Sequence, residues 1–184
     1  MLTTATQTIL QNKKINWAEF QKKYLSREDN FKYEWVNGQV EKSTRSMDKT
    51  QLYILRNLTK YFRSLNYQGI LAAESDNFFN QNHRRPDIVF YTDEQIDLAR
   101  HEENIVVPQF VIEVISKRDQ MNLVHNKMQD YRKAGVQVIW HIFPLLEEIH
   151  VYLGDTMTIC KGEKICSASP VLPDFQIKAI DVFI

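Results

Sequence analysis

The chain has 184 residues, of which 43% are hydrophobic and 25% charged, with 23 basic and 23 acidic side chains. This length and apolar content suit one folded core and exclude a disordered chain. The balance of charge excludes a protein that binds nucleic acid through a global excess of positive charge, so any polyanion must be held locally.

The sequence carries no targeting pattern that we can identify. Two cysteines are too few for a disulfide framework or a four-thiolate zinc site, which favours a reducing cytoplasm. The polar start lacks the pattern of a signal peptide, and no apolar run approaches the ~20 residues of a membrane-spanning helix. We therefore expect a loose segment over residues 1–12 and one cytoplasmic domain over residues 13–184, with no membrane partner.

In chain order, the first predicted elements are a short helix and a hairpin. Asn16 suits the N-cap and Glu19 the capping-box position of a helix that ends near Leu25. Residues 31–35 then alternate between aromatic and charged side chains before Asn37-Gly38, the dipeptide preferred in a type I′ turn. This order predicts a strand, a tight turn and a second strand.

An amphipathic helix is predicted next, from near Asp48 to Leu65. Its apolar residues recur at steps of three and four, which is the period of one helix face. These residues are Leu52, Leu55, Leu58, Phe62 and Leu65. We expect this stripe to face the core and the polar side to face water.

The rest of the chain alternates short apolar runs with one long helix. The runs 86–91, 110–116 and 137–143 are rich in Val and Ile, as expected of central strands covered on both faces. A helix from near Asp119 to Ala134 ends at Gly135, and Gly154-Asp155 suits the II′ turn of a later hairpin. The order of elements predicts a mixed α/β domain with a central sheet.

Two acids lie in or beside these apolar strands. Asp87 follows Pro86 at the start of one strand, where a turn is the ordinary explanation for an aspartate. Glu113 lies inside the run 110–115, where an ionised carboxylate without a partner would cost several kcal/mol. It therefore needs a cation, and the pattern leaves open whether this is a buried Arg or Lys or a hard metal ion.

Two further charged residues stand out less clearly. Lys127 lies in the apolar stripe of its helix, between Val124 and Tyr131, where it could extend its amine to solvent or pair with Glu113. Glu34 alternates with aromatic residues in its strand, and from this pattern alone solvent exposure is favoured.

Taken together, several motifs resemble the PD-(D/E)XK nuclease superfamily and, more closely, the Uma-two family of putative restriction endonucleases, which is abundant in cyanobacteria. The motifs are Tyr33-Glu34 with Gly38, Arg85-Pro86-Asp87, Ile112 to Ser116, Lys127, Tyr131, Ala134-Gly135-Val136, Trp140, Leu172 to Phe175 and Val182-Phe183. The resemblance covers nearly everything after Trp17. It implies a restriction-endonuclease-like α/β core, in which a central mixed β-sheet is flanked by helices and extended by β-hairpins.

The resemblance also implies an activity, the Mg²⁺- or Mn²⁺-dependent hydrolysis of DNA by a homodimer. It assigns Asp87 and Glu113 as metal ligands, Glu34 as an additional acid near the metal and Lys127 as the catalytic lysine. The usual superfamily lysine lies two residues after the strand acid, where this chain has Ile115. Lys117, four residues after Glu113, is an alternative to Lys127 that we expect to be solvated.

Some features leave other functions open. Arg84 and Arg85 could hold a backbone phosphate or be ordinary surface arginines. Where the family commonly has a histidine, this chain has Lys49-Thr50-Gln51. The alternatives to an active nuclease are a catalytically inactive nuclease-fold protein that binds DNA or a protein, and a scaffold with a buried Glu113–Lys127 ion pair.

Overall fold

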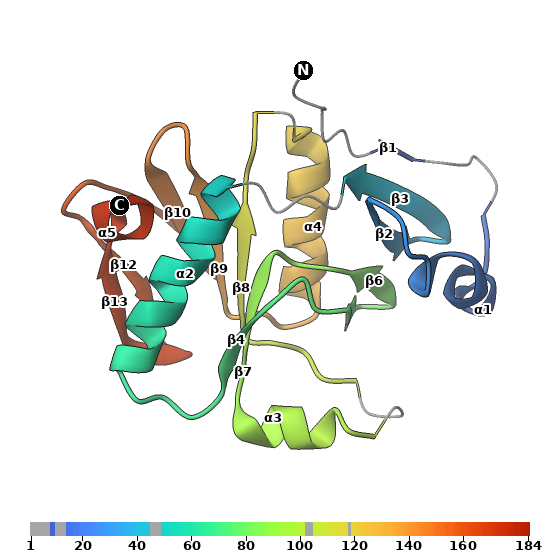
Figure 1. The fold of residues 1–184 in the computed structure, drawn as a ribbon, viewed down its shortest axis with the longest axis horizontal. Helices are drawn as coiled ribbons and strands as arrows, with labels where there is room; N and C mark the ends of the chain where they lie inside the picture. Colours follow the sequence, from blue (N-terminus) through green and yellow to red (C-terminus); the bar gives the residue numbers. More distant parts are fainter. Residues whose placement is uncertain (1–7, 10–13, 45–48, 102–104, 118) are drawn as a thin grey trace.

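A computed structural model describes residues 8–9, 14–44, 49–101, 105–117 and 119–184 of the chain (Figure 1). Of the segment 1–12 that we expect to be loose, only Thr8 and Ile9 are described, and they form strand β1 (Thr8–Ile9). The remainder of that segment lies outside the described residues, as does the predicted helix start at Asp48. No helix in the described parts of the chain is long and apolar enough to cross a membrane.

The described strands form three sheets. The large sheet has the order β11 (Thr156–Lys161), β10 (Glu148–Leu153), β9 (Val138–Phe143), β8 (Phe110–Val114), β7 (Ile88–Tyr91) and β4 (Ile70–Ala73). A second sheet has the order β1, β3 (Gln39–Thr44), β2 (Phe31–Val36), β6 (Asn82–Arg84) and β5 (Asn77–Phe79). The third sheet pairs β12 (Ile165–Ala168) with β13 (Leu172–Lys178).

The helices connect and cover these sheets. They are α1 (Trp17–Phe20) with its π-helical continuation η1 (Gln21–Leu25), α2 (Lys49–Ser64), α3 (Asp93–Leu98), α4 (Met121–Lys133) and α5 (Ala179–Phe183). In the large sheet β8 and β9 pair in parallel, while β7 and β8 are antiparallel. Helix α4 makes the crossover from β8 to β9 that a parallel pair requires.

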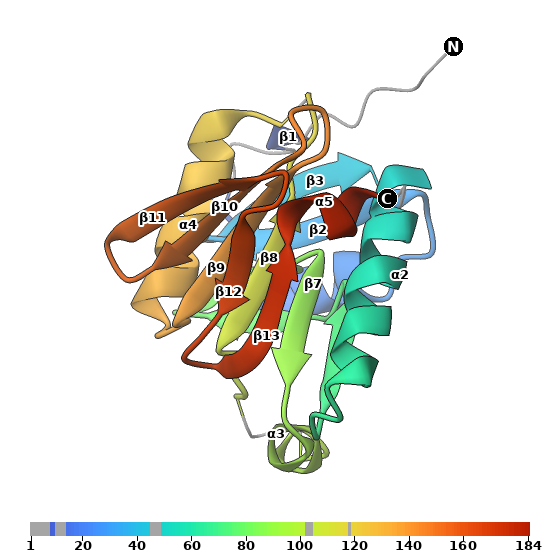
Figure 2. The same cartoon turned by 90° about the vertical axis from the view of Figure 1, so that its left-hand side faces the viewer.

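The large sheet is covered on both faces, with α2 and α4 on opposite sides (Figure 2). Ile88 and Ile112 belong to the same apolar cluster as the buried residues of α2. Their neighbours Val89 and Val111 cluster instead with Met128 and Tyr131 of α4. Because side chains alternate along a strand, burial on both faces makes the strands continuous apolar runs, as predicted from the sequence.

Local signals were accurate at the start of the first helix and at two hairpin turns. The side chain of Asn16 accepts a hydrogen bond from the Glu19 amide at 2.8 Å, which confirms the predicted N-cap. Asn37 and Gly38 have φ angles of 50° and 81°, so the hairpin between β2 and β3 closes through two left-handed residues, as a type I′ turn requires. The predicted hairpin at Gly154 joins β10 to β11.

The predicted apolar stripe of α2 was wrong at its start. The structure buries Ile54, Leu58 and Phe62, whereas Leu52 is 58% exposed. The shift arises because Ile54 and Leu58 pack on the sheet, which turns Leu52 away from it. Periodicity identified the helix, but its rotation about its own axis depended on the surface it covers.

Candidate active site

The two strand acids lie opposite each other on neighbouring strands. Ile88 of β7 pairs with Ile112 of β8 in an antiparallel register, and one further step places Asp87 opposite Glu113. Directly opposed side chains point to the same face of a sheet, with Cβ atoms only about 4.5–5.5 Å apart. The amide of Val114 donates a hydrogen bond to Oδ2 of Asp87 at 2.8 Å, which holds this carboxylate at the strand end.

Glu113 is buried in spite of its charge. The hydroxyl of Tyr131 donates a hydrogen bond to Oε1, and Nζ of Lys127 lies 3.6 Å from Oε2. Burial raises the pKa of Glu113 to about 7, and the nearby carboxylate of Asp87 adds to this rise, while Lys127 opposes it. Glu113 therefore keeps a proton more readily than an exposed glutamate does. An added cation would lower its pKa and favour loss of this proton.

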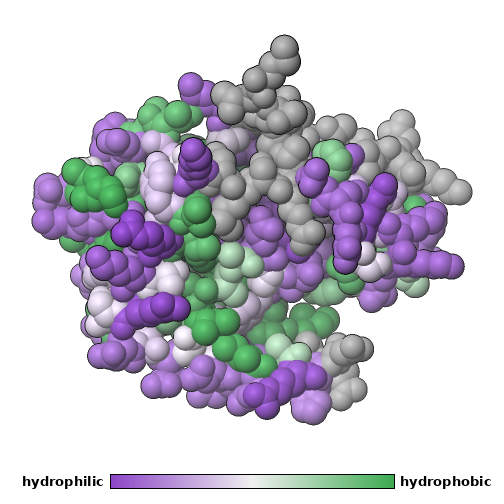
Figure 3. All heavy atoms as spheres, viewed as in Figure 1, coloured by the Kyte–Doolittle hydropathy of each residue, from purple (hydrophilic) through white to green (hydrophobic). Residues whose placement is uncertain are grey.

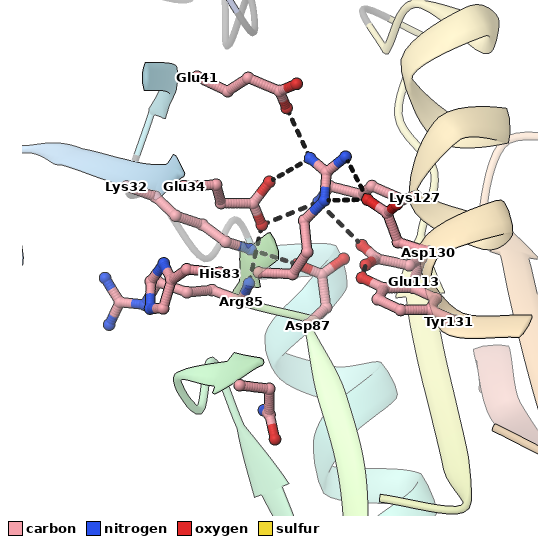
Figure 4. A network of polar contacts seen from close by, with 12 residues as sticks. Lys32, Glu34, Glu41, His83, Arg85, Asp87, Glu113, Lys127, Asp130 and Tyr131 are labelled. Atoms are coloured by element: carbon pink, nitrogen blue, oxygen red, sulfur yellow. Dashed lines mark hydrogen bonds and ion pairs between the residues drawn. The ribbon is translucent and has the colours of Figure 1, made fainter. Parts of the chain in front are cut away.

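Lys127 points inward from α4 and lies between two acids (Figure 4). Its Nζ is 3.3 Å from Oε1 of Glu34 as well as 3.6 Å from Oε2 of Glu113. Burial alone would lower the pKa of Lys127, but these two carboxylates raise it above its usual value. The amine is therefore a charged ammonium group at neutral pH. Its inward position agrees with the periodicity of the helix.

Glu34 reaches the same point from the second sheet. The pattern of β2 favoured solvent exposure, but Glu34 is only 2% exposed, so this interpretation was wrong. The amide of Arg85 donates to Oε1 of Glu34 at 2.8 Å. Burial would raise the pKa of Glu34, but Lys127, Arg84 and Lys32 hold it well below its ordinary value. Glu34 is therefore a carboxylate that helps to anchor Lys127.

Arg84 links the second sheet to α4. Its Nη1 lies 3.2 Å from Glu34 and 2.6 Å from Glu41, and its Nη2 lies 2.8 Å from Asp130 of α4. The side chain is 1% exposed. This burial argues against the predicted phosphate contact for Arg84 and equally against a surface arginine. Arg85 is 15% exposed and its Nε lies 2.9 Å from Asp76.

Sequence reasoning missed a second lysine in the site. Nζ of Lys32 lies 3.4 Å from Oδ1 of Asp87, and the side chain is buried. Lys32 and Glu34 are two residues apart on the same face of β2, so the alternation that favoured exposure of Glu34 gave no reason to single out Lys32. The aromatic residues on the opposite face gave no sign that this face is also covered. By contrast, Lys117 is exposed, as expected for a residue just beyond β8.

The site therefore brings together charged side chains from both sheets and from α4. Figure 4 shows Lys32 and Glu34 reaching in from β2, opposite Lys127 and Tyr131 from α4, with Asp87 between them. Within the described residues, no group of three or more His, Cys, Asp or Glu side chains is arranged to hold a metal ion. The candidate ligands are the opposed pair Asp87 and Glu113, and Mg²⁺ is commonly bound through only one or two carboxylates.

Asp87 also borders a small cleft beside the start of α2. The cleft is lined by Gln51, Leu55, Glu74, Asp87, Ile88 and Val114. Gln51 belongs to the tripeptide that stands where the Uma-two family commonly has a histidine. One residue of this tripeptide therefore lies near Asp87.

Comparison with known proteins identifies a matching family and a solved structure with a similar fold. The model of the family Uma2, described as "Putative restriction endonuclease", matches residues 17–182. A similar solved structure is the crystal structure of a putative nuclease belonging to DUF820 from Anabaena variabilis ATCC 29413. The two sequences are 18% identical, and the match covers 92% of this chain and 97% of the Anabaena chain. The two structures superimpose with a TM-score of 0.73. No curated protein matches the chain. The shared fold confirms the predicted α/β class, with a central mixed sheet flanked by helices.

Proposed function

The chain belongs to the Uma2 family, described as putative restriction endonucleases, and we propose that it hydrolyses phosphodiester bonds of DNA with a divalent metal ion. Family membership and fold support a nuclease. The single observation that carries the finer proposal is the convergence of Asp87, Glu113 and Lys127, which come from separate elements of the chain. The ion, its ligands and the catalytic lysine are our inference from that convergence.

The acid pair fits Mg²⁺ or Mn²⁺. Its donors are carboxylate oxygens, which hard cations prefer, and two carboxylates ~4 Å apart repel by roughly 4 kcal/mol at an effective dielectric of 20. Burial is the main cause of the raised pKa of Glu113, and the carboxylate of Asp87 adds to the rise. A bound ion would act as a Lewis acid on the scissile phosphate and lower the pKa of the attacking water.

Lys127 supplies positive charge where negative charge develops on the phosphate. Because its pKa is raised, it is an ammonium ion and does not accept a proton from water at neutral pH. It therefore acts by orienting the attacking water and by stabilising the oxygens of the transition state. Glu34 keeps the amine in place, and Tyr131 orients the carboxylate of Glu113.

The substrate contacts extend beyond the acid pair. Lys32 and Lys127 supply positive charge beside Asp87 and Glu113. Lys32 and Lys127, the latter still held by Glu34, would contact the scissile phosphate, and Arg85 would contact a phosphate nearby. By resemblance to restriction enzymes, we also propose that two copies of the chain act together to cut both strands.

The test is cleavage of supercoiled plasmid DNA by the purified protein with Mg²⁺ or Mn²⁺ and with a chelator. We expect nicking or cutting that needs the ion and that is lost in Asp87→Ala, Glu113→Ala and Lys127→Ala. Asp174→Ala, at an exposed position on β13, is the matched control and should cleave normally. Circular dichroism checks that each variant is folded. Full cleavage by Asp87→Ala would refute the assignment.

A second function is favoured by one feature of the cleft. Gln51 borders the cleft with Asp87 where relatives commonly have a histidine, which fits a protein that binds DNA or another protein without cleaving it. In that case titration calorimetry would detect no binding of Mg²⁺ or Mn²⁺, and no ion would raise the melting temperature. Measurable metal binding together with cleavage would exclude this alternative.

A further inference from the structure

Helix α2 has an outer face that is basic and carries no compensating acid. Its sequence, KTQLYILRNLTKYFRS, contains four basic residues and no Asp or Glu. Lys49, Arg56, Lys60 and Arg63 are all exposed. At about 100° per residue their spacing places them within one side of the helix. None of the four forms an ion pair with any residue that the structure describes.

This basic face is unusual for the chain as a whole. The chain has equal numbers of basic and acidic residues, so four cations on one helix that pair with no described acid are a local concentration of charge. Figure 3, in the same view as Figure 1, shows strongly hydrophilic side chains in dark purple over the position of α2. Such a patch raises the local concentration of a polyanion without a global excess of positive charge.

Adjoining hollows lie along α2 from the cleft beside Asp87 to the end of the helix. The first is the cleft that Gln51 and Leu55 share with Asp87. The second lies on α2 itself and is lined by Leu52, Leu55, Arg56, Thr59, Lys60 and Arg63. A third shares Thr59 and Arg63 with the second and extends over residues 66–71. Neighbouring hollows thus share lining residues along a helix about 24 Å long.

From these observations we propose that the outer face of α2 binds the phosphate backbone of duplex DNA and leads it to Asp87. This inference rests on the proposed nuclease function. Arg84 cannot supply the contact, because it is buried and pairs with Glu34, Glu41 and Asp130. Arg85, which also pairs with Asp76, could offer one phosphate contact but not a surface that follows a duplex. Duplex DNA carries one charge per about 1.7 Å of axis, so a 24 Å surface faces many phosphates. The hollow lined by Arg56, Lys60 and Arg63 shares Leu55 with the cleft that Asp87 borders, so the basic face leads toward this acid.

The experiment measures how DNA binding depends on salt. A fluorescent 20-base-pair duplex is titrated with protein by anisotropy at several salt concentrations, with Ca²⁺ replacing Mg²⁺. In the variant R56Q/K60Q/R63Q, we expect the slope of log K against log salt to fall by about 3 and the affinity at 0.1 M salt to fall by roughly 100-fold. Arg56→Gln alone should lower the slope by about 1.

A matched variant controls for net charge. K14Q/K22Q/K133Q removes the same number of exposed cations from places away from α2 and should leave the slope unchanged. An unchanged slope in the α2 variant, or an equal fall in both variants, would overturn the inference even if the wild-type protein cleaves DNA. Conversely, a selective fall in the α2 variant without any metal-dependent cleavage would support this surface and count against the proposed nuclease.

Discussion

Helices α2 and α4 pack on opposite faces of the same sheet but place their charged residues in opposite ways. The buried residues of α2 are all apolar, and its four cations face outward. Helix α4 also buries apolar residues, yet it turns Lys127 and Asp130 inward, where they meet acids and Arg84. The core under α2 is thus purely apolar, whereas the region under α4 is a network of charges.

The difference indicates where the chemistry lies. An inward charge costs several kcal/mol unless it is paired, so α4 needs partners from the second sheet and α2 needs none. Charged groups kept in the interior in spite of this cost are typical of functional sites. The exposed cations of α2, which pair with no described acid, are suited to bind a polyanion. The following predictions test this contrast.

The largest expected effect is the loss of Arg84. Arg84→Met removes the cation shared by Glu34, Glu41 and Asp130, so the free energy of unfolding should fall by about 3–5 kcal/mol. Arg56→Met on the outer face of α2 should change it by less than about 0.5 kcal/mol. Urea unfolding followed by circular dichroism measures both. Similar values for the two variants would mean that the two regions do not differ as we infer.

A second effect is a pH dependence caused by Glu113. Its pKa is about 7 when folded and 4.5 in the reference state, so the folded protein binds this proton more tightly. The resulting stabilisation, about 3 kcal/mol at most, is complete below pH 4.5 and is lost as the pH rises toward 7. The measurement is the free energy of unfolding of the wild type and of Glu113→Gln, both in the presence of a chelator. The wild-type value minus the variant value should fall as the pH rises from 4.5 to 7.

Another buried group acts in the opposite direction and must be separated from Glu113. Burial lowers the pKa of His141 to about 4 from 6.5, so its contribution to stability is lost as the pH falls from 6.5 toward 4. His141 is present in both proteins, and its contribution cancels in their difference. A difference that stays constant between pH 4.5 and 7 would contradict the raised pKa of Glu113.

The smallest effect concerns Lys32 and metal binding. Its ammonium group lies 3.4 Å from Oδ1 of Asp87, so it competes with any cation that this acid binds. Lys32→Met should therefore bind Mn²⁺ about tenfold more tightly, which corresponds to 1.4 kcal/mol. Titration calorimetry measures the affinity, and Lys22→Met, at an exposed position, serves as the control. Weaker binding in Lys32→Met would show that the lysine supports the metal site rather than competing for it.

The site could be predicted from the sequence only in part. Glu113 and Lys127 stood out because each breaks an apolar pattern that spans a few neighbouring residues, and the structure places them 3.6 Å apart. Lys32 and Arg84 broke no such pattern, because alternation in β2 and the short run of β6 are equally compatible with an exposed face. Their burial follows from contacts with residues far away in the chain.

By itself the sequence predicted the first helix, two hairpins, the central strands and the two long helices, because N-caps, turn dipeptides and periods of two or 3.6 residues depend on near neighbours. Motif order also identified the family. Only the tertiary structure decided which face of each element is covered and which charges meet, as Leu52, Glu34 and Arg84 illustrate. Those outcomes depend on the packing of one sheet and its helices against another, which no local pattern records.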